Sequence, residues 1–179
     1  MFKKIKHFCL KKFKHLSSEE INVLEWRKKG IKIGNNCHIY STLPTTRDCF
    51  LLTIGNDVTI SGKCVFLLHD SSINYPSGGK FTDLLGEIKI GNNCFIGYSS
   101  IILPGVTLAD GIIVGAGSVV TKSFDHRDCI IAGNPARIIS DIKSFFEKNK
   151  SKGVNLNGLS QEEIQELIKS SEGTQLVVR

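Results

Sequence analysis

The side chain best placed to do chemistry in this sequence is His69. It stands where a regular stretch of the chain gives way to the polar segment 67–87, which includes Ser77-Gly78-Gly79-Lys80. A histidine at such a boundary is held by a rigid scaffold and can still face a cleft, as a general base must. Histidines are also common as surface groups, so position alone leaves a purely structural role open.

The other histidines argue against a metal centre. They are scattered along the chain at His7, His15, His38 and His126. Their spacing is not typical of metal ligands, and no CxxC pair is present, so neither a structural zinc site nor a zinc-lyase site is expected.

The scaffold that must position His69 is a repeat of six residues. Aliphatic residues recur at every sixth position from Ile90 to Val120, and apolar residues keep the same register at Ile33, Ile39, Ile54, Ile60 and Phe66. A helix repeats its buried face about every 3.6 residues and a strand about every two, so a period of six predicts short strands separated by corners. The chain is expected to coil as a hexapeptide solenoid.

Small and polar residues mark the corners of that coil. Glycine often follows the aliphatic residue, and the pairs Asn35-Asn36, Asn56-Asp57 and Asn92-Asn93 come next. Asparagine and aspartate are the residues other than glycine that best tolerate the left-handed backbone conformation, so these pairs predict tight corners. The fifth repeat position is small or apolar and includes three of the six cysteines, Cys37, Cys64 and Cys94. They are expected to be buried thiols rather than disulfides.

Two interruptions break the repeat. Ile39 and Ile54 are fifteen residues apart, three more than a multiple of six, which predicts a small loop around 43–47. The pattern is lost again between Phe66 and Ile90. A long excursion from a regular scaffold usually carries function, so a site is expected at the second loop.

A basic helix is expected at the N-terminal end. Residues 2–16 carry an apolar stripe, and the six lysines among residues 1–16 equal the net charge of +6. Such a helix can bind an anionic membrane surface, or its stripe can pack on the first coil as a cap; both interpretations stay open. One lysine cluster without a recognition motif argues against nucleic acid as a partner.

Helices are also expected after the coil. Residues 138–149 predict one helix, and Ser160 with Glu163 forms a capping box that predicts another. The chain is therefore expected to contain a basic helical segment 1–29, a coil domain 30–137 and a helical extension 138–179. No stretch is apolar enough for a signal peptide or a membrane span, which favours a cytoplasmic protein, peripheral at most at the inner face of the membrane.

The run IGNNCFIGYSSIILPGVTLADGIIVGAGSVVTKSF, followed by IIAGNPARII, resembles the C-terminal coils of the hexapeptide-repeat acyltransferases. It is most similar to their sugar O-acetyltransferase branch, which includes galactoside, maltose and nodulation-factor acetyltransferases and the capsule and O-antigen modifying enzymes. The similarity covers roughly residues 30–142. It implies an all-β fold, a left-handed parallel β-helix with N-terminal and C-terminal helices. It also implies a homotrimer with acetyl-CoA as co-substrate, bound in grooves between subunits, and no metal.

The resemblance implies roles for single residues. His69 matches the general base, which takes the proton from an acceptor hydroxyl as its oxygen attacks the thioester. Tyr98 matches the position whose backbone N–H faces the oxyanion. The positions that match the coenzyme A groove are Phe95, Tyr98, Ala116, Thr121, Lys122 and Arg137.

The acceptor site is where the chain departs from that family. Ser41 stands near the position where galactoside and maltose enzymes carry an asparagine, and Asp70 and Asn74 are the other expected acceptor contacts. Adjacent residues of a strand face opposite sides, so Asp70 is a poor partner for the His69 ring. The resemblance favours acetyl transfer to a sugar hydroxyl of a surface polysaccharide precursor. An antibiotic O-acetyltransferase, and a non-catalytic or metal-lyase β-helix protein, stay open as alternatives.

Overall fold

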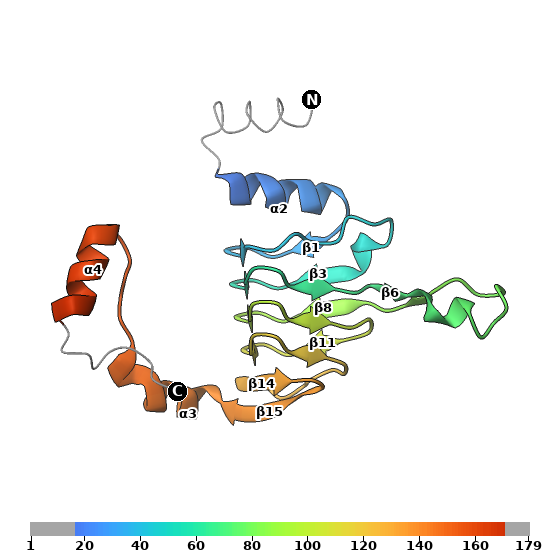
Figure 1. The fold of residues 1–179 in the computed structure, drawn as a ribbon. Helices are drawn as coiled ribbons and strands as arrows, with labels where there is room; N and C mark the ends of the chain where they lie inside the picture. The colour runs from blue at the N-terminus through green and yellow to red at the C-terminus, as the bar shows by residue number, and fades with distance from the viewer. Residues whose placement is uncertain (1–16, 171–179) are drawn as a thin grey trace. The chain divides into compact units, whose positions relative to one another are not determined.

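Short parallel strands stack in three sheets in the computed structural model, which describes residues 17–170 (Figure 1). Sheet A contains β1 (Lys32–Ile33), β3 (Leu52–Ile54), β8 (Ile88–Ile90) and β11 (Thr107–Leu108). Sheet B contains β2 (His38–Ile39), β4 (Thr59–Ile60), β9 (Phe95–Ile96), β12 (Ile113–Val114), β14 (Cys129–Gly133) and β15 (Ala136–Asp141). Sheet C contains β5 (Val65–Phe66), β10 (Ile101–Ile102) and β13 (Val119–Val120).

Successive strands pass from sheet A to sheet B to sheet C and back, so the chain winds as a coil. Ile90 pairs with Leu108 and Ile96 with Val114, each 18 residues further along. One turn of the coil therefore consists of three six-residue repeats. The aliphatic repeat positions face inward, and they are at most 2% exposed at Ile54, Ile60, Ile90, Ile96, Ile102, Leu108, Val114 and Val120. The five cysteines among the described residues are free thiols, and all but Cys37 are buried.

The asparagine pairs build the corners, as predicted. The second member of each pair has a left-handed backbone, with φ of 54° at Asn36, 57° at Asp57 and 55° at Asn93. Short polar side chains can adopt this conformation at little cost, which explains why asparagine and aspartate occur at these positions.

The first members of the pairs form a ladder of hydrogen bonds between turns. The Asn35 N–H donates to Asn56 Oδ1 at 2.9 Å, and the Asn56 N–H donates to Asn92 Oδ1 at 2.9 Å. The Asn92 N–H donates to Asp110 Oδ1 at 2.8 Å, and Arg127 ends the ladder on Asp110 Oδ2 at 2.6 Å. Side chains of one turn thus satisfy the backbone of the turn before it.

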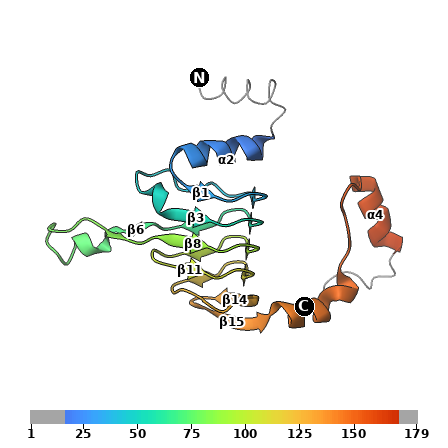
Figure 2. The same cartoon turned by 180° about the vertical axis from the view of Figure 1, so that it is seen from behind.

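Both interruptions of the repeat are visible as insertions into single turns. Ile33 pairs with Ile54 21 residues later, and the extra residues lie before β3 together with the short helix η1 (Cys49–Leu51). Ile54 pairs with Ile90 36 residues later, so an extra 18 residues leave the coil as a long loop. Strands β6 (His69–Asp70) and β7 (Leu84–Leu85) pair antiparallel and form the stem of this loop. The short helix η2 (Ser71–Asn74) directly follows β6. The loop projects from the coil in both views (Figures 1 and 2).

A helix precedes the first turn of the coil. Helix α2 (Ser18–Lys28) begins with a capping box, in which Ser17 Oγ accepts from the Glu20 N–H and Glu20 accepts from the Ser17 N–H. Its buried residues are Ile21 and Trp26, and Trp26 belongs to the core of the coil. The basic helix predicted at 2–16 lies outside the described residues.

The C-terminal unit begins after Ile139 and contains two helices. The helix predicted from residue 138 begins only at Ile142, because β15 continues to Asp141, whose side chain caps α3 (Ile142–Asn149) by accepting from the Ser144 N–H. A short helix, η3 (Lys150–Lys152), follows. Helix α4 (Gln161–Ser170) has the predicted capping box between Ser160 and Glu163. The division into segments 1–29, 30–137 and 138–179 stays a prediction.

Candidate functional site

The two interruptions of the coil meet at His69. A hollow of about 830 Å³ is lined by residues of the small loop before β3 and of the long loop's stem, namely Thr46, Arg47, Asp48, Phe50, His69, Thr82, Asp83 and Leu85. The repeat itself contributes none of these side chains. The regular turns therefore act as a frame, and the two departures from them supply the polar groups.

A carboxylate holds the His69 ring. His69 Nδ1 lies 2.6 Å from Oδ2 of Asp48, which is buried at 8% exposure. An ionised carboxylate can only accept, so Nδ1 carries the proton and Nε2 presents its lone pair. Within residues 17–170 no side chain forms a hydrogen bond with Nε2. The ring is thus oriented through one nitrogen and available for proton transfer through the other.

The contact between His69 and Asp48 shifts the pKa of both side chains. The hydrogen bond with Asp48, and then the charge of Asp48, raise the pKa of His69 above its ordinary value. Burial pushes the pKa of Asp48 upward, but interactions with the Thr46 side chain and with His69 outweigh it, so the Asp48 pKa is lowered. Asp48 is therefore ionised at neutral pH, and His69 is a stronger base than an isolated histidine.

Asp48 is the residue of this candidate site that the sequence did not indicate. It lies one residue beyond the loop predicted around 43–47, and 21 residues before His69. The available signal was the interruption itself, because both residues belong to segments that leave the repeat. Arg47 and Asp83 line the same hollow. They also lie in segments outside the repeat, where the six-residue pattern does not show which residues come together.

Ser41 does not lie in this hollow. It is buried, its hydroxyl donates to the Ser61 carbonyl at 2.6 Å, and it accepts from the Cys64 N–H at 2.7 Å. Both hydrogen-bonding functions of the hydroxyl are used within the coil. This placement gives Ser41 a structural role and does not favour the predicted contact with an acceptor.

Asp70 and Asn74 are also absent from the lining of the hollow. Asp70 Oδ1 accepts from the Ser72 N–H at 2.9 Å and caps η2, and this hydrogen bond is the main reason its pKa is lowered. Asn74 lies in η2, where its carbonyl accepts from the Gly79 N–H at 3.1 Å. Both residues shape the long loop, and their contact with an acceptor stays a prediction.

The residues predicted to bind coenzyme A lie elsewhere on the coil. Tyr98 and Ala116 stand at the same corner of adjacent turns, between sheets B and C, and neither N–H donates a hydrogen bond to any described residue. The Tyr98 carbonyl instead accepts from the Gly117 N–H at 2.8 Å. Two free donors in a row are suited to a polar ligand that runs along this corner, as the predicted oxyanion and pantetheine contacts require.

The remaining coenzyme A candidates are exposed. Phe95 projects outward from β9, and Thr121 is exposed after β13. Lys122 Nζ lies 5.7 Å from the centroid of the Phe124 ring, and Arg137 donates to the Ala136 carbonyl at 2.8 Å. These residues do not line the hollow at His69. Within one chain, the structure therefore does not bring the base and the predicted cofactor contacts together.

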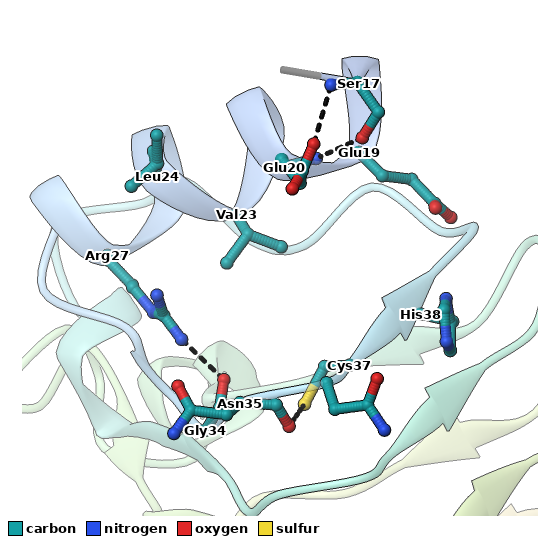
Figure 3. A pocket seen from close by; sticks show the side chains of 11 residues that line it. Ser17, Glu19, Glu20, Val23, Leu24, Arg27, Gly34, Asn35, Cys37 and His38 are labelled. Carbon is teal, nitrogen blue, oxygen red and sulfur yellow. Dashed lines mark hydrogen bonds between the residues drawn. The ribbon is translucent and has the colours of Figure 1, made fainter. Parts of the chain in front are cut away.

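A second hollow, of about 460 Å³, separates α2 from the first turn of the coil (Figure 3). Arg27 spans it from the helix and donates to the carbonyls of Ile33 at 3.0 Å and Gly34 at 2.5 Å. Its lining includes His38 but none of the residues predicted to act in catalysis, in coenzyme A binding or in acceptor binding. The Arg27 contacts attach α2 to the coil.

Within residues 17–170, no group of three or more histidine, cysteine, aspartate or glutamate side chains is arranged to hold a metal ion. No helix of this part of the chain is long and apolar enough to cross a membrane.

Comparison with known proteins places this geometry in a family. Residues 87–122 match the family described as "Hexapeptide repeat of succinyl-transferase". Protein CapG of Staphylococcus aureus is 40% identical over 142 residues, which cover 75% of this chain and 77% of CapG. Galactoside O-acetyltransferase of Escherichia coli K12 is 34% identical over 112 residues, or 63% of this chain and 54% of that protein.

A solved structure of the same repeat class is also similar to this chain. A hexapeptide-repeat acetyltransferase from Vibrio cholerae, solved with acetyl coenzyme A, has a TM-score of 0.53 and 28% identity, covering 64% of this chain and 61% of that one. This chain thus spans most of CapG and little more than half of the other two proteins. The chain belongs to the hexapeptide-repeat acyltransferase superfamily, and it is similar to a sugar O-acetyltransferase of that superfamily.

Proposed function

We propose that this chain transfers the acetyl group of acetyl-CoA to a sugar hydroxyl, with His69 as the general base and Asp48 as the residue that positions it. The observation that carries the proposal is the 2.6 Å hydrogen bond between His69 Nδ1 and Asp48 Oδ2. It fixes the tautomer whose Nε2 can accept a proton, beside a hollow large enough for a sugar ring. Acetyl-CoA is bound in the related structure from Vibrio cholerae, which supports it as the co-substrate here.

The proposed reaction is direct transfer. Nε2 of His69 removes the proton of the acceptor hydroxyl while that oxygen attacks the thioester carbonyl, and the resulting imidazolium is stabilised by the Asp48 carboxylate. The Tyr98 N–H donates to the carbonyl oxygen as it becomes an oxyanion. When the tetrahedral intermediate collapses, the C–S bond breaks and the coenzyme A sulfur takes the proton back from His69. No covalent enzyme intermediate forms.

The surrounding assembly is part of the proposal. The coil is left-handed and the enzyme is a homotrimer, so that His69 of one subunit faces the corner of Tyr98 and Ala116 on a neighbour. Acetyl-CoA lies along this corner, with its pantetheine near Phe95 and Ala116 and its nucleotide near Thr121, Lys122 and Arg137. The similarity to galactoside O-acetyltransferase supports a sugar acceptor, which in this proposal belongs to a surface polysaccharide precursor made in the cytoplasm.

Replacement of the base tests this function. His69→Ala is expected to lower turnover by roughly 10²–10⁴-fold, while the affinity for coenzyme A stays close to that of the unmodified enzyme. Turnover is measured as coenzyme A thiol released from acetyl-CoA in the presence of sugar acceptors, and affinity by calorimetry. Activity retained by His69→Ala would remove the base from the mechanism.

A further inference from the structure

The hollow at His69 presents more than the catalytic pair. Beyond Asp48 and His69 it is lined by one cation, one carboxylate, two threonines and two apolar side chains, namely Arg47, Asp83, Thr46, Thr82, Phe50 and Leu85. The proposed transfer reaction uses none of these six side chains. They are therefore candidates for recognising the acceptor.

Asp83 is a fixed and ionised hydrogen-bond acceptor. It lies just before β7, and its Oδ1 accepts a hydrogen bond from the Ser71 hydroxyl across the loop. The side chains of Ser71 and then Thr82 lower the pKa of Asp83. A carboxylate has about four lone-pair sites, so Asp83 can still accept from a ligand beside its contacts with Ser71 and Thr82.

Arg47 is an exposed donor that lines the same hollow. The ion pairs found within residues 17–170 include neither Arg47 nor Asp83, although both line the same cavity. A guanidinium and a carboxylate that do not bridge each other leave room for a ligand that bonds to both. Vicinal hydroxyls fit such a pair, because one can accept from the guanidinium while the other donates to the carboxylate.

Two exposed apolar side chains complete the lining. Phe50 is 57% exposed and Leu85 is 65% exposed, each beside polar neighbours. An aromatic face next to fixed donors and acceptors suits a pyranose, which has an apolar C–H face and hydroxyls around its edge.

The charges favour an uncharged ring. When His69 is neutral, as a base must be, the hollow contains two carboxylates, Asp48 and Asp83, against one guanidinium, Arg47. An acidic acceptor would add a third negative charge close to the two carboxylates, and like charges repel at such short range. A neutral sugar satisfies Asp83 and Arg47 without this repulsion.

We propose that Asp83, Arg47 and Phe50 form the acceptor subsite and select an uncharged sugar ring over its acidic counterparts. Asp83 accepts from one ring hydroxyl, Arg47 donates to another, and Phe50 packs against the C–H face. A third hydroxyl of the same ring then faces Nε2 of His69. The inference rests on the proposed acetyl transfer and adds the class of acceptor and the residues that choose it.

The test compares Asp83→Asn with the unmodified enzyme on matched acceptors. Neutral hexoses are paired with their uronic acids and their 1-phosphates, so that every ring hydroxyl is retained in at least one charged acceptor. Coenzyme A thiol release gives kcat and KM for each. Asparagine keeps the shape and removes the charge, so KM for the neutral hexose is expected to rise about 10- to 100-fold, with kcat little changed. The ratio of kcat/KM for a charged acceptor to kcat/KM for its neutral hexose should rise in Asp83→Asn.

Two further variants complete the test. Arg47→Gln should raise KM for the neutral hexose in the same way, because it removes the second contact. Asp125→Asn is the matched control, since Asp125 is exposed and does not line the hollow. Its kinetic constants should equal those of the unmodified enzyme.

The outcomes separate the subsite from the reaction. If Asp83→Asn leaves KM unchanged, or the unmodified enzyme prefers a uronic acid or a sugar phosphate, the subsite is wrong while acetyl transfer stands. If thiol release from hexoses does not depend on His69, the proposed function fails whatever Asp83→Asn does. If no sugar of the panel is acetylated, both fail.

Discussion

His69 and Asp48 are 21 residues apart in the sequence and joined by one short hydrogen bond in the fold. That bond has two consequences for catalysis. It holds the ring in one tautomer, and it stabilises the imidazolium that forms during proton transfer. Asp48 touches no reacting atom in the proposed mechanism, so its effect must act through His69.

Asp48→Asn is expected to change the pH profile as well as the rate. A general base works only when it is deprotonated, so activity is lost as the pH falls through the pKa of His69. Asp48 raises that pKa, first by its hydrogen bond and then by its charge. Removing the charge should therefore move the acid limb of kcat/KM to lower pH, and lower the plateau by at least about 10-fold.

The measurement is kcat/KM against pH for the two enzymes, with Asp125→Asn as the control for loss of a surface carboxylate. A merely structural role for Asp48 would reduce the amount of folded enzyme without moving the acid limb. An unshifted limb in Asp48→Asn would thus show that Asp48 does not tune His69.

His69 could be proposed as a base from the sequence, whereas its hydrogen-bond partner Asp48 could not. His69 marks the end of a regular pattern, which is visible in one dimension. An intact repeat determines which residues of successive turns lie side by side, but Asp48 belongs to a segment that has left the repeat. The neighbour considered instead was Asp70, whose carboxylate caps η2 by accepting from Ser72.

Among the elements, the corners show how a repeat sequence specifies its own stacking. Asn92 Oδ1 accepts from both the N–H and the side-chain amide of Asn56, at 2.9 and 3.1 Å. Its own N–H and amide donate to Asp110 Oδ1, at 2.8 and 3.1 Å. One side chain thus satisfies backbone groups that the strands leave unpaired.

Asn92→Ala is expected to lower the free energy of unfolding by about 1–3 kcal/mol, because the Asn56 N–H loses its acceptor at a corner. The measurement is the midpoint of denaturant unfolding. Lys89→Ala is the control on the preceding strand, where Lys89 forms only an exposed ion pair with Glu87 and little loss is expected. Equal midpoints for Asn92→Ala and Lys89→Ala would show that the ladder does not stabilise the coil.

The helices show what local signals can and cannot give. The capping box of Ser160 and Glu163 was found in the sequence and is present in the structure. The same signature, Ser17 with Glu20, begins α2. The predicted N-terminal helix lay instead on the lysine-rich residues 2–16. The predicted start of α3 at residue 138 is too early, since the two isoleucines at 138 and 139 fit a helix or the strand that this segment forms.

At the scale of the whole molecule, the proposed site is incomplete in one chain. Tyr98 lies at the corner between sheets B and C, where its ring packs against Gly62. His69 lies beyond the far end of β5, which starts at that corner. The hollow at His69 includes none of the predicted coenzyme A contacts. A second copy of the chain that brings its own corner of Tyr98 and Ala116 to His69 resolves this separation.

The assembly is therefore expected to be a trimer with sites shared between neighbours. Sedimentation should give about three times the chain mass of 19.7 kDa. The sharper experiment mixes two inactive variants, His69→Ala and Ala116→Trp, the second of which places a bulky ring in the predicted pantetheine groove. If each site takes its base from one subunit and its groove from the next, random mixed trimers regain about a quarter of full activity, because one interface in four joins an intact base to an intact groove. The two variants are unfolded together and refolded as a mixture, so that their subunits combine at random. If base and groove belong to the same chain, this mixture shows no activity. An active monomer in sedimentation would contradict the shared site.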